Sequence, residues 1–347
     1  MKKYNVAVVG VGAVGEELLR VLRQRAFPVG ELRVFARSSR EIVVDNEKFD
    51  VQQVSPEGFS GIDIALFAGT EGEKGAAVTF AAEAIKRGAV VIDNGADFRL
   101  REDVPLVVPE VNPQDVSAHK GIIANPNCST VQLVAAVAPI HREAGIKRMI
   151  VSTYQAVSGA GRQAITELTA QTSELLTTHP GDLGSDCNLS ADVKVFPRRI
   201  AFNVIPHIGS FQDAGYTTEE WKMVQETHKI LHDEKIKISA TTARVPVIVG
   251  HSQAVYLETR RKIALGKVRK LLQRAKGIRL VDDPKGPDAR TYPVPLDAAG
   301  KDDVLIGRVR PDPFVPKGLW LWVVADNLRK GAALNAVQIA ELLIKPA

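Results

Sequence analysis

The chain has 347 residues, of which 45% are hydrophobic and 24% charged, a composition typical of a water-soluble globular protein of about two domains. Its formal net charge of +5 and the lack of any long Lys/Arg run argue against a nucleic-acid-binding protein. Two cysteines exclude a disulfide framework, no apolar stretch is long enough to span a membrane, and no signal-peptide pattern is present, so we expect a cytoplasmic enzyme without membrane partners.

Strands and helices are predicted to alternate in the first part of the chain. Short β-branched segments predict strands, and a helical spacing of apolar residues predicts the helices between them. The predicted strands are residues 4–9, 32–36, 62–68, 90–93 and 122–124, and the predicted helices are 16–25, 75–87 and 131–144. This alternation is typical of a doubly wound parallel sheet.

The pattern changes after residue 148. Strands are predicted at 149–154, 236–242, 245–249 and 253–260, with helices at 164–176 and 218–232. Residues 282–300 are rich in Pro, Gly and Asp and predict a surface loop, which a strand at 320–325 and a helix at 332–344 follow. Such an arrangement indicates a mixed sheet covered by helices.

A glycine motif follows the first predicted strand. The motif Gly10-x-Gly12-x-x-Gly15 lies where the next helix begins. Glycines at such a place let backbone N–H groups approach the pyrophosphate of a dinucleotide. A simple tight turn is the alternative interpretation. Arg37 and Ser38 follow the second predicted strand, and no carboxylate occurs before Glu41, which favours the 2′-phosphate of NADP over NAD. A solvated basic turn is the alternative interpretation of Arg37.

The predicted fold is therefore of the α/β class. We expect a Rossmann-type NADP-binding domain over residues 1–127, completed by about 318–347. Residues 128–317 are expected to form an α+β catalytic domain. Cys128 is then predicted to lie at the domain junction, a usual place for a ligand cleft.

Cys128 precedes a predicted helix. A helix N-terminus lowers the pKa of a thiol, which makes Cys128 a candidate nucleophile, although a lone cysteine is more often a small buried residue. His251 is the candidate histidine that a nucleophilic cysteine needs nearby in space. Cys187 is expected to be a small buried residue or a plain loop thiol.

No metal site is predicted. His228 and His232 lie four residues apart on one predicted helix, a spacing that suits two metal ligands. Since no third ligand motif is near, a solvated helix face is the favoured interpretation.

Six segments, in chain order, resemble the aspartate-semialdehyde dehydrogenase family over nearly the whole chain. They are NPNCST (125–130), IVSTYQAVSGAG (150–161), IAFNVIP (200–206), YTTEEWKM (216–223), ATTARVPVIVGHS (240–252) and VADNLRKGAAL (324–334). The resemblance implies reversible, NADP-dependent reductive dephosphorylation of L-4-aspartyl phosphate to L-aspartate 4-semialdehyde. It also implies a place in lysine (diaminopimelate), threonine and methionine biosynthesis, and a homodimer or homotetramer built on the catalytic domain.

The same resemblance implies roles for individual residues. Cys128 would form the acyl thioester, His251 would act as acid and base, and Gln155 would orient the substrate. Arg244 would bind the substrate carboxylate and Glu219 its amino group. The residues implied to hold phosphate are Arg99, Asn127 and Lys222. Those implied to hold NADP are Gly10, Gly12, Ala13, Val14, Gly15, Arg37, Ser38, Asn94, Ser158, Gly159 and Asn327.

Two departures from the family pattern affect the cofactor site. The family usually has GATGAVG, one residue more than this glycine motif, and a longer turn after the second strand than residues 36–40. A related acyl-phosphate reductase of the N-acetylglutamyl phosphate type is one alternative, but the acidic Glu219 argues against it. A catalytically silent NADP-binding protein is another alternative, and against it argues the joint presence of Cys128, Gln155, Arg244 and His251.

Overall fold

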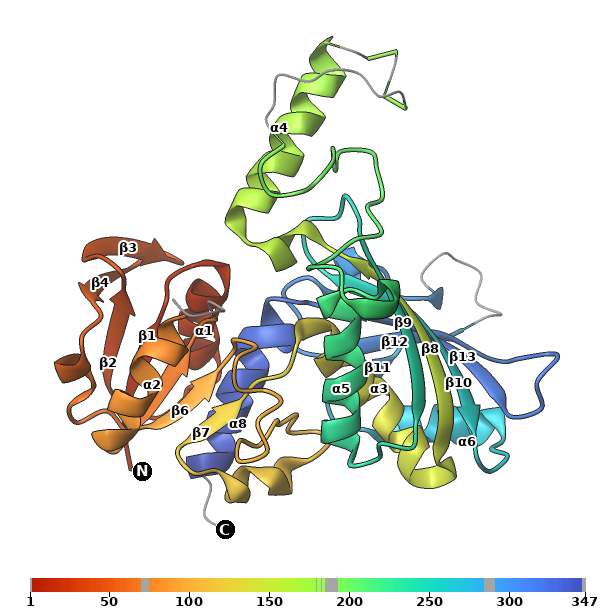
Figure 1. The fold of residues 1–347 in the computed structure, drawn as a ribbon, viewed down its shortest axis with the longest axis horizontal. Helices are drawn as coiled ribbons and strands as arrows, with labels where there is room; N and C mark the ends of the chain where they lie inside the picture. Colours follow the sequence, from red (N-terminus) through yellow and green to blue (C-terminus); the bar gives the residue numbers. More distant parts are fainter. Residues whose placement is uncertain are drawn as a thin grey trace. The chain divides into compact units, whose positions relative to one another are not determined.

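The computed structural model describes residues 2–69, 75–178, 180–181, 183–184, 193–283 and 291–344. Two compact units divide the chain, each with its own sheet (Figure 1). The first unit comprises Met1–Ala138, Gln225–Glu234 and Leu328–Ala347, and the second comprises Pro139–Val224 and Lys235–Asn327. Among the described residues, no helix has both the length and the apolarity needed to cross a membrane.

The sheet of the first unit has seven strands in the order β3-β4-β2-β1-β5-β6-β7. They are β1 (Tyr4–Val9), β2 (Val29–Ala36), β3 (Arg40–Val44), β4 (Glu47–Gln53), β5 (Ile64–Phe67), β6 (Val90–Asp93) and β7 (Ile122–Ala124). Neighbouring strands are parallel except in the β3–β4 hairpin. This hairpin was not predicted from the sequence, and its turn residues Asp45 and Asn46 both have positive φ.

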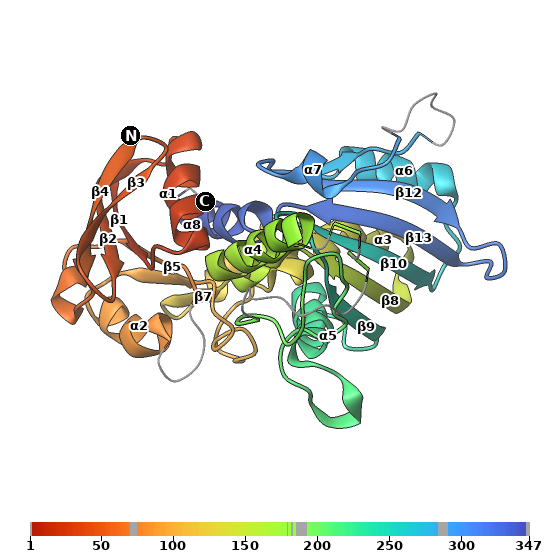
Figure 2. The ribbon, with the colours of Figure 1, turned by 90° about the horizontal axis from the view of Figure 1, so that it is seen from above.

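Helices cover both faces of this sheet, which confirms the doubly wound class. Side chains alternate along β1, so Val6 and Val8 pack with helices α1 (Ala13–Gln24) and α8 (Leu334–Ile344). Ala7 and Val9 face the other way and pack with α2 (Ala76–Lys86) and the start of α3 (Cys128–Ala144). Figure 2 shows α1 and α8 on one side of the sheet and α2 on the other.

The turn after β1 is built for close backbone packing. Gly10 has a φ of +101°, and a Cβ atom on Gly15 would lie 1.9 Å from the Gly10 carbonyl oxygen, so only glycine fits at residue 15. A Cβ on Gly12 would instead meet nothing within 4 Å, and no side chain caps α1 there. Because the chain runs from β1 to β2 on one side and returns to β5 on the other, this turn lies at the topological switch point.

The second unit contains a six-stranded mixed sheet in the order β11-β12-β13-β10-β8-β9. Its strands are β8 (Ile146–Gln155), β9 (Lys237–Arg244), β10 (His251–Thr259), β11 (Ile278–Leu280), β12 (Val304–Pro311) and β13 (Gly318–Ala325). The pairs β8–β9 and β11–β12 are parallel, and the other three are antiparallel. Strands β11 and β12, which lie at one edge of this sheet, were not predicted from the sequence.

The prediction of a strand at residues 245–249 is wrong. This segment contains Pro246 and a tight turn in which Val247 N donates to Val245 O, so it forms a loop. Its carbonyl groups accept instead from Val157 N and Ser158 N, which fixes the loop beside the end of β8. The predicted surface loop at 282–300 lies partly outside the described residues, and its remainder includes a short helix, α7 (Pro295–Ala298).

Helices α4 (Arg162–Thr178) and α6 (Leu265–Arg274) belong to the second unit. Helix α5 (Thr218–Leu231) is divided between the units, with residues 218–224 in the second and 225–231 in the first. Helix α4 is held to residues 193–205 by buried polar groups, since Glu167 accepts from Val195 N and Gln171 accepts from Ile200 N. The first turn of α5 lies against β9, because Glu220 accepts from Thr242 N at 2.9 Å.

Candidate active site

In the first unit, Cys128 is the first residue of helix α3, three residues before the predicted helix start. Asn127 caps this helix, since its Oδ1 accepts from Ser129 N at 2.9 Å and from Thr130 N at 3.2 Å. Cys128 is partly exposed. The positive end of the helix dipole and partial exposure are the conditions that favour a reactive thiolate.

A glycine packs directly on Cys128. A Cβ atom on Gly331 would lie 2.8 Å from Cys128 Cβ, so any larger side chain would push the cysteine out of place. Gly331 lies in the π-helical turn Arg329–Ala333 that precedes α8. Such turns are frequent at functional sites. Gly331 was not predicted as a site residue, although it lies within one of the six segments that resemble the family.

Arg99 lies beside the same segment and is only 5% exposed. Its Nε donates to Asn125 O at 2.9 Å and its Nη2 donates to Asn94 O at 2.7 Å. Its Nη1 donates to Glu226 Oε1 of helix α5 at 3.0 Å. The structure therefore brings Arg99, Asn94 and the segment of Cys128 together.

In the second unit, three candidate residues lie at one edge of the sheet. Gln155 ends β8 and Arg244 ends the parallel strand β9, where the two residues are register partners. His251 begins β10, which runs antiparallel to β8 and pairs Ser252 with Tyr154. Strand direction alone thus gathers an amide, a guanidinium and an imidazole at this edge.

Hydrogen bonds fix the side chains of this cluster. Gln155 Nε2 donates to Glu219 Oε1 at 3.0 Å, and Arg244 Nη1 donates to Ala156 O at 2.7 Å. Arg244 and Glu219 are 6% and 7% exposed. Lys222, one turn after Glu219 on α5, is half-buried. The substrate-binding candidates of this unit are thus held in place before any ligand binds.

His251 is fully buried, and its Nδ1 accepts from Ala156 N at 3.0 Å. Burial, and secondarily the charge of Arg244, hold the pKa of His251 well below its usual range. A neutral imidazole that accepts at Nδ1 carries its proton on Nε2. A Cβ on Gly159 would lie 3.1 Å from this Nε2, so glycine keeps that space clear.

The remaining cofactor candidates fall into two groups. In the second unit, Asn327 Nδ2 donates to Ser158 Oγ at 2.9 Å, and Asn327 Oδ1 accepts from Gly250 N at 2.9 Å. In the first unit, Arg37 and Ser38 are exposed after the end of β2. Ala13 and Val14 form the first turn of α1.

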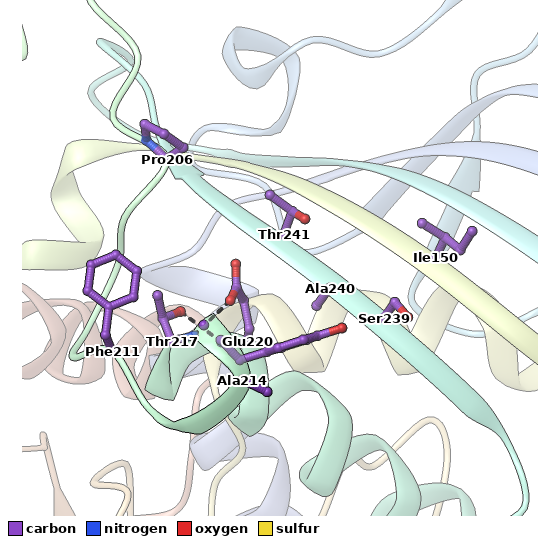
Figure 3. A pocket seen from close by; sticks show the side chains of 11 residues that line it. Ile150, Pro206, Phe211, Ala214, Thr217, Glu220, Ser239, Ala240 and Thr241 are labelled. Carbon is purple, nitrogen blue, oxygen red and sulfur yellow. Dashed lines mark hydrogen bonds between the residues drawn. The ribbon is translucent and has the colours of Figure 1, made fainter.

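A pocket of about 340 Å³ lies elsewhere in the second unit (Figure 3). None of the eleven residues that line it is a predicted site residue. Its one carboxylate, Glu220, accepts from Thr217 N at 2.8 Å and from Thr242 N at 2.9 Å. Glu220 therefore holds the start of α5 and is not available for acid–base chemistry.

His228 lies on α5, whereas His232 directly follows the end of this helix. His232 Nε2 lies 2.9 Å from Asp115 Oδ2, and the His232 side chain is 59% exposed.

Two family models match the chain: residues 5–119 match the NAD binding domain of semialdehyde dehydrogenase, and residues 137–330 match the dimerisation domain. An aspartate-semialdehyde dehydrogenase from Aquifex aeolicus is 49% identical over 99% of this chain and 98% of its own length. The enzyme of that name from Bacillus subtilis is 47% identical over 98% of this chain and 97% of its own. A crystal structure of aspartate semialdehyde dehydrogenase II from Vibrio cholerae, complexed with ASA, has a TM-score of 0.90, 46% identity and 99% coverage of both chains.

The low pKa of His251 makes stability depend on pH. Below about pH 6.5 the unfolded chain takes up a proton at this residue and the folded chain does not. The free energy of unfolding should therefore fall as pH decreases from 6.5, by up to about 1.4 kcal/mol per pH unit from this group. Urea unfolding at several pH values measures this loss.

The control is His251→Asn, which keeps an acceptor near the position of Nδ1 but does not titrate. The difference in pH slope between the two proteins isolates the contribution of His251. Equal slopes below pH 6.5 would show that the folded protein protonates His251 normally.

Proposed function

Because the chain belongs to the aspartate-semialdehyde dehydrogenase family, we propose that it catalyses the reversible NADP-dependent reductive dephosphorylation of L-4-aspartyl phosphate to L-aspartate 4-semialdehyde. The observation that carries the proposal is the position of Cys128 at a capped helix N-terminus, beside a buried arginine. The aldehyde product would supply the biosynthesis of lysine, threonine and methionine.

Cys128 is the proposed nucleophile. Its thiolate attacks the acyl carbon, a C–S bond forms, and the C–O bond to phosphate breaks, so that inorganic phosphate leaves with the electron pair. Arg99, Asn127 and Lys222 are proposed to hold this phosphate. The fixed guanidinium of Arg99 supports its assignment, since a preorganised cation stabilises an oxyanion without reorganising.

His251 is proposed to act on the acyl oxygen. A nicotinamide cofactor would supply the electron pair and hydrogen that reduce the thioester, which would place negative charge on that oxygen. The Nε2–H of a neutral His251 would donate a hydrogen bond to this oxygen and stabilise its charge. When the C–S bond breaks, the oxygen becomes the aldehyde carbonyl and the bond's electron pair leaves with sulfur, so Cys128 regains its thiolate.

The amino-acid end of the substrate is proposed to bind the cluster at the end of β8 and β9. Arg244 pairs with the carboxylate, Glu219 with the ammonium, and Gln155 orients the acyl group. The Gln155–Glu219 hydrogen bond supports this, because it holds the acid in one orientation. An N-acetylated substrate has no ammonium for Glu219, so the N-acetylglutamyl phosphate alternative is disfavoured.

A nicotinamide dinucleotide is the cofactor of the matched N-terminal domain. The turn after β1 fits one, since open space at Gly12 adjoins a helix N-terminus without a side-chain cap. We propose that Gly10–Gly15 hold the pyrophosphate and that Arg37 and Ser38 select NADP through its 2′-phosphate. Residues Asn94, Ser158, Gly159 and Asn327 are proposed to line the nicotinamide half.

The assembly is proposed to be a homodimer, with a homotetramer as the alternative. The match of residues 137–330 to a dimerisation domain supports association through the second unit. Large apolar side chains of this unit are exposed in the single chain, among them Phe202 at 48%, Val204 at 54% and Phe211 at 63%. Burial of such side chains in an interface would be favourable.

Cys128→Ala is expected to abolish turnover in both directions, because no covalent intermediate can form. Its affinity for NADP should stay within a few-fold of the wild-type value. Turnover is measured by the absorbance of reduced nicotinamide, and the affinity for NADP is measured by fluorescence titration. The matched control is Cys187→Ser, which should keep full activity. A Cys128→Ala enzyme with normal turnover would contradict the proposed nucleophile.

Arg37→Asp is expected to weaken NADP binding by roughly ten- to a hundredfold and to leave NAD equal or better, because a charged hydrogen bond to the 2′-phosphate is lost. The wild type should prefer NADP by about the same factor. Lys3→Asp makes the same charge change beside the amino end of β1, away from the carboxyl ends of the strands, and should leave this preference intact. Unchanged NADP affinity in Arg37→Asp would mean that Arg37 is only a solvated residue.

A further inference from the structure

We propose that Glu226 is a positioning residue, which holds the phosphate-binding Arg99 and the peptide before Cys128 in one fixed geometry. This inference rests on the proposed function. Glu226 lies on helix α5 and is 1% exposed. Its Oε1 accepts from Arg99 Nη1 at 3.0 Å, and its Oε2 accepts from Asn127 N at 2.7 Å.

The two oxygens of Glu226 act on different parts of the candidate site. One fixes Nη1 of Arg99, while Asn125 O and Asn94 O fix Nε and Nη2, so the guanidinium plane is defined by three acceptors. The other fixes the backbone of Asn127, whose side chain caps α3 immediately before Cys128. A single buried carboxylate thus sets both the cation that would hold phosphate and the helix start that carries the nucleophile.

Helix α5 also holds the backbone of Arg99. Lys229, three residues after Glu226, donates from Nζ to Arg99 O at 2.8 Å, to Arg101 O at 2.6 Å and to Val104 O at 2.8 Å. The same helix therefore fixes Arg99 at its backbone through Lys229 and at its side chain through Glu226. Such a double attachment is expected where the orientation of the guanidinium matters.

A positioning role and a charge-neutralising role predict opposite results. If Glu226 only offset the charge of Arg99, its removal would leave a stronger cation and tighter phosphate binding. If Glu226 positions Arg99, its removal frees the guanidinium and weakens phosphate binding. The three-acceptor geometry around Arg99 favours positioning.

Glu226→Gln tests this inference, because glutamine has nearly the same size but only one acceptor oxygen. In the phosphorylating direction, the KM for phosphate should rise about tenfold or more, whereas the KM values for semialdehyde and NADP should stay within about twofold. In an Arg99→Ala background the same change should raise the KM for phosphate by less than it does in the wild type, because only the contact of Glu226 with the Asn127 backbone remains to be lost. Additive effects of the two changes would overturn the inference, as would an unchanged or lower KM for phosphate in Glu226→Gln.

The matched control is Glu220→Gln on the same helix. Glu220 is also buried and also accepts from two donors, but these are the backbone N–H groups of Thr217 and Thr242, and neither belongs to the segments of Arg99 and Cys128. This variant should lose a comparable amount of thermal stability without a selective change in the KM for phosphate. If Glu220→Gln raises the KM for phosphate as selectively and as much as Glu226→Gln does, the rise comes from a general loosening of α5.

Two further measurements test the inference where Glu226→Gln does not fold or where turnover cannot be followed. If Glu226→Gln does not fold, Glu226→Asp keeps the charge but is one methylene too short to reach both donors, and it should show the same selective rise. Calorimetric titration with inorganic phosphate compares wild type and variant without turnover. If the wild type lacks turnover but binds phosphate more tightly than Glu226→Gln does, the proposed reaction is overturned and this inference is kept. If wild type and Glu226→Gln bind phosphate with equal affinity, the inference is overturned.

Discussion

The start of helix α3 is the constraint on which the candidate site depends. A nucleophilic thiolate needs positive potential, partial access to substrate and a fixed direction. The helix dipole supplies the first, and Asn127 secures the helix end by capping it. Gly331 packs directly against Cys128, and a Cβ atom at residue 331 would lie too close to the cysteine. This close contact keeps Cys128 in place.

In each unit, the charged candidate residues are held by hydrogen bonds to other protein groups. Arg99 in the first unit, and Glu219 and Arg244 in the second, are each under 8% exposed and each has a hydrogen-bond partner. Burying an ion is costly unless it is paired, so these contacts serve folding as well as binding. Ligand binding then needs little side-chain ordering, which is the physical meaning of preorganisation.

Much of this arrangement could be predicted from sequence because it depends on local patterns. The β-branched run before Gly10 predicts β1, and Cys128 was placed within three residues of a helix start. The β3–β4 hairpin was missed because its strands carry mostly charged and polar residues, such as Arg40 and Asp50, without a clear apolar alternation. Residues 245–249 misled in the opposite way, since their apolar side chains belong to a loop that contacts the backbone at Val157.

Glu226 escaped prediction for a different reason. An acid among Lys222, Lys229 and Asp233 is normally a solvated helix residue, and only the tertiary fold puts it against Arg99 and Asn127. Its spacing from Glu219 and Lys222, seven and four residues, does place all three on one helix face, and this signal could have found it. Long-range partners of buried charges are the part of a site that periodicity alone does not reveal.

The most direct test of the central claim follows the absorbance of reduced nicotinamide with L-aspartate 4-semialdehyde, inorganic phosphate and NADP. The account predicts NADP reduction that requires phosphate. It also predicts a kcat/KM at least about a hundredfold lower for N-acetyl-L-glutamate 5-semialdehyde, because Glu219 would lose its charged partner. Turnover without phosphate, or equal turnover of the N-acetylated aldehyde, would contradict it.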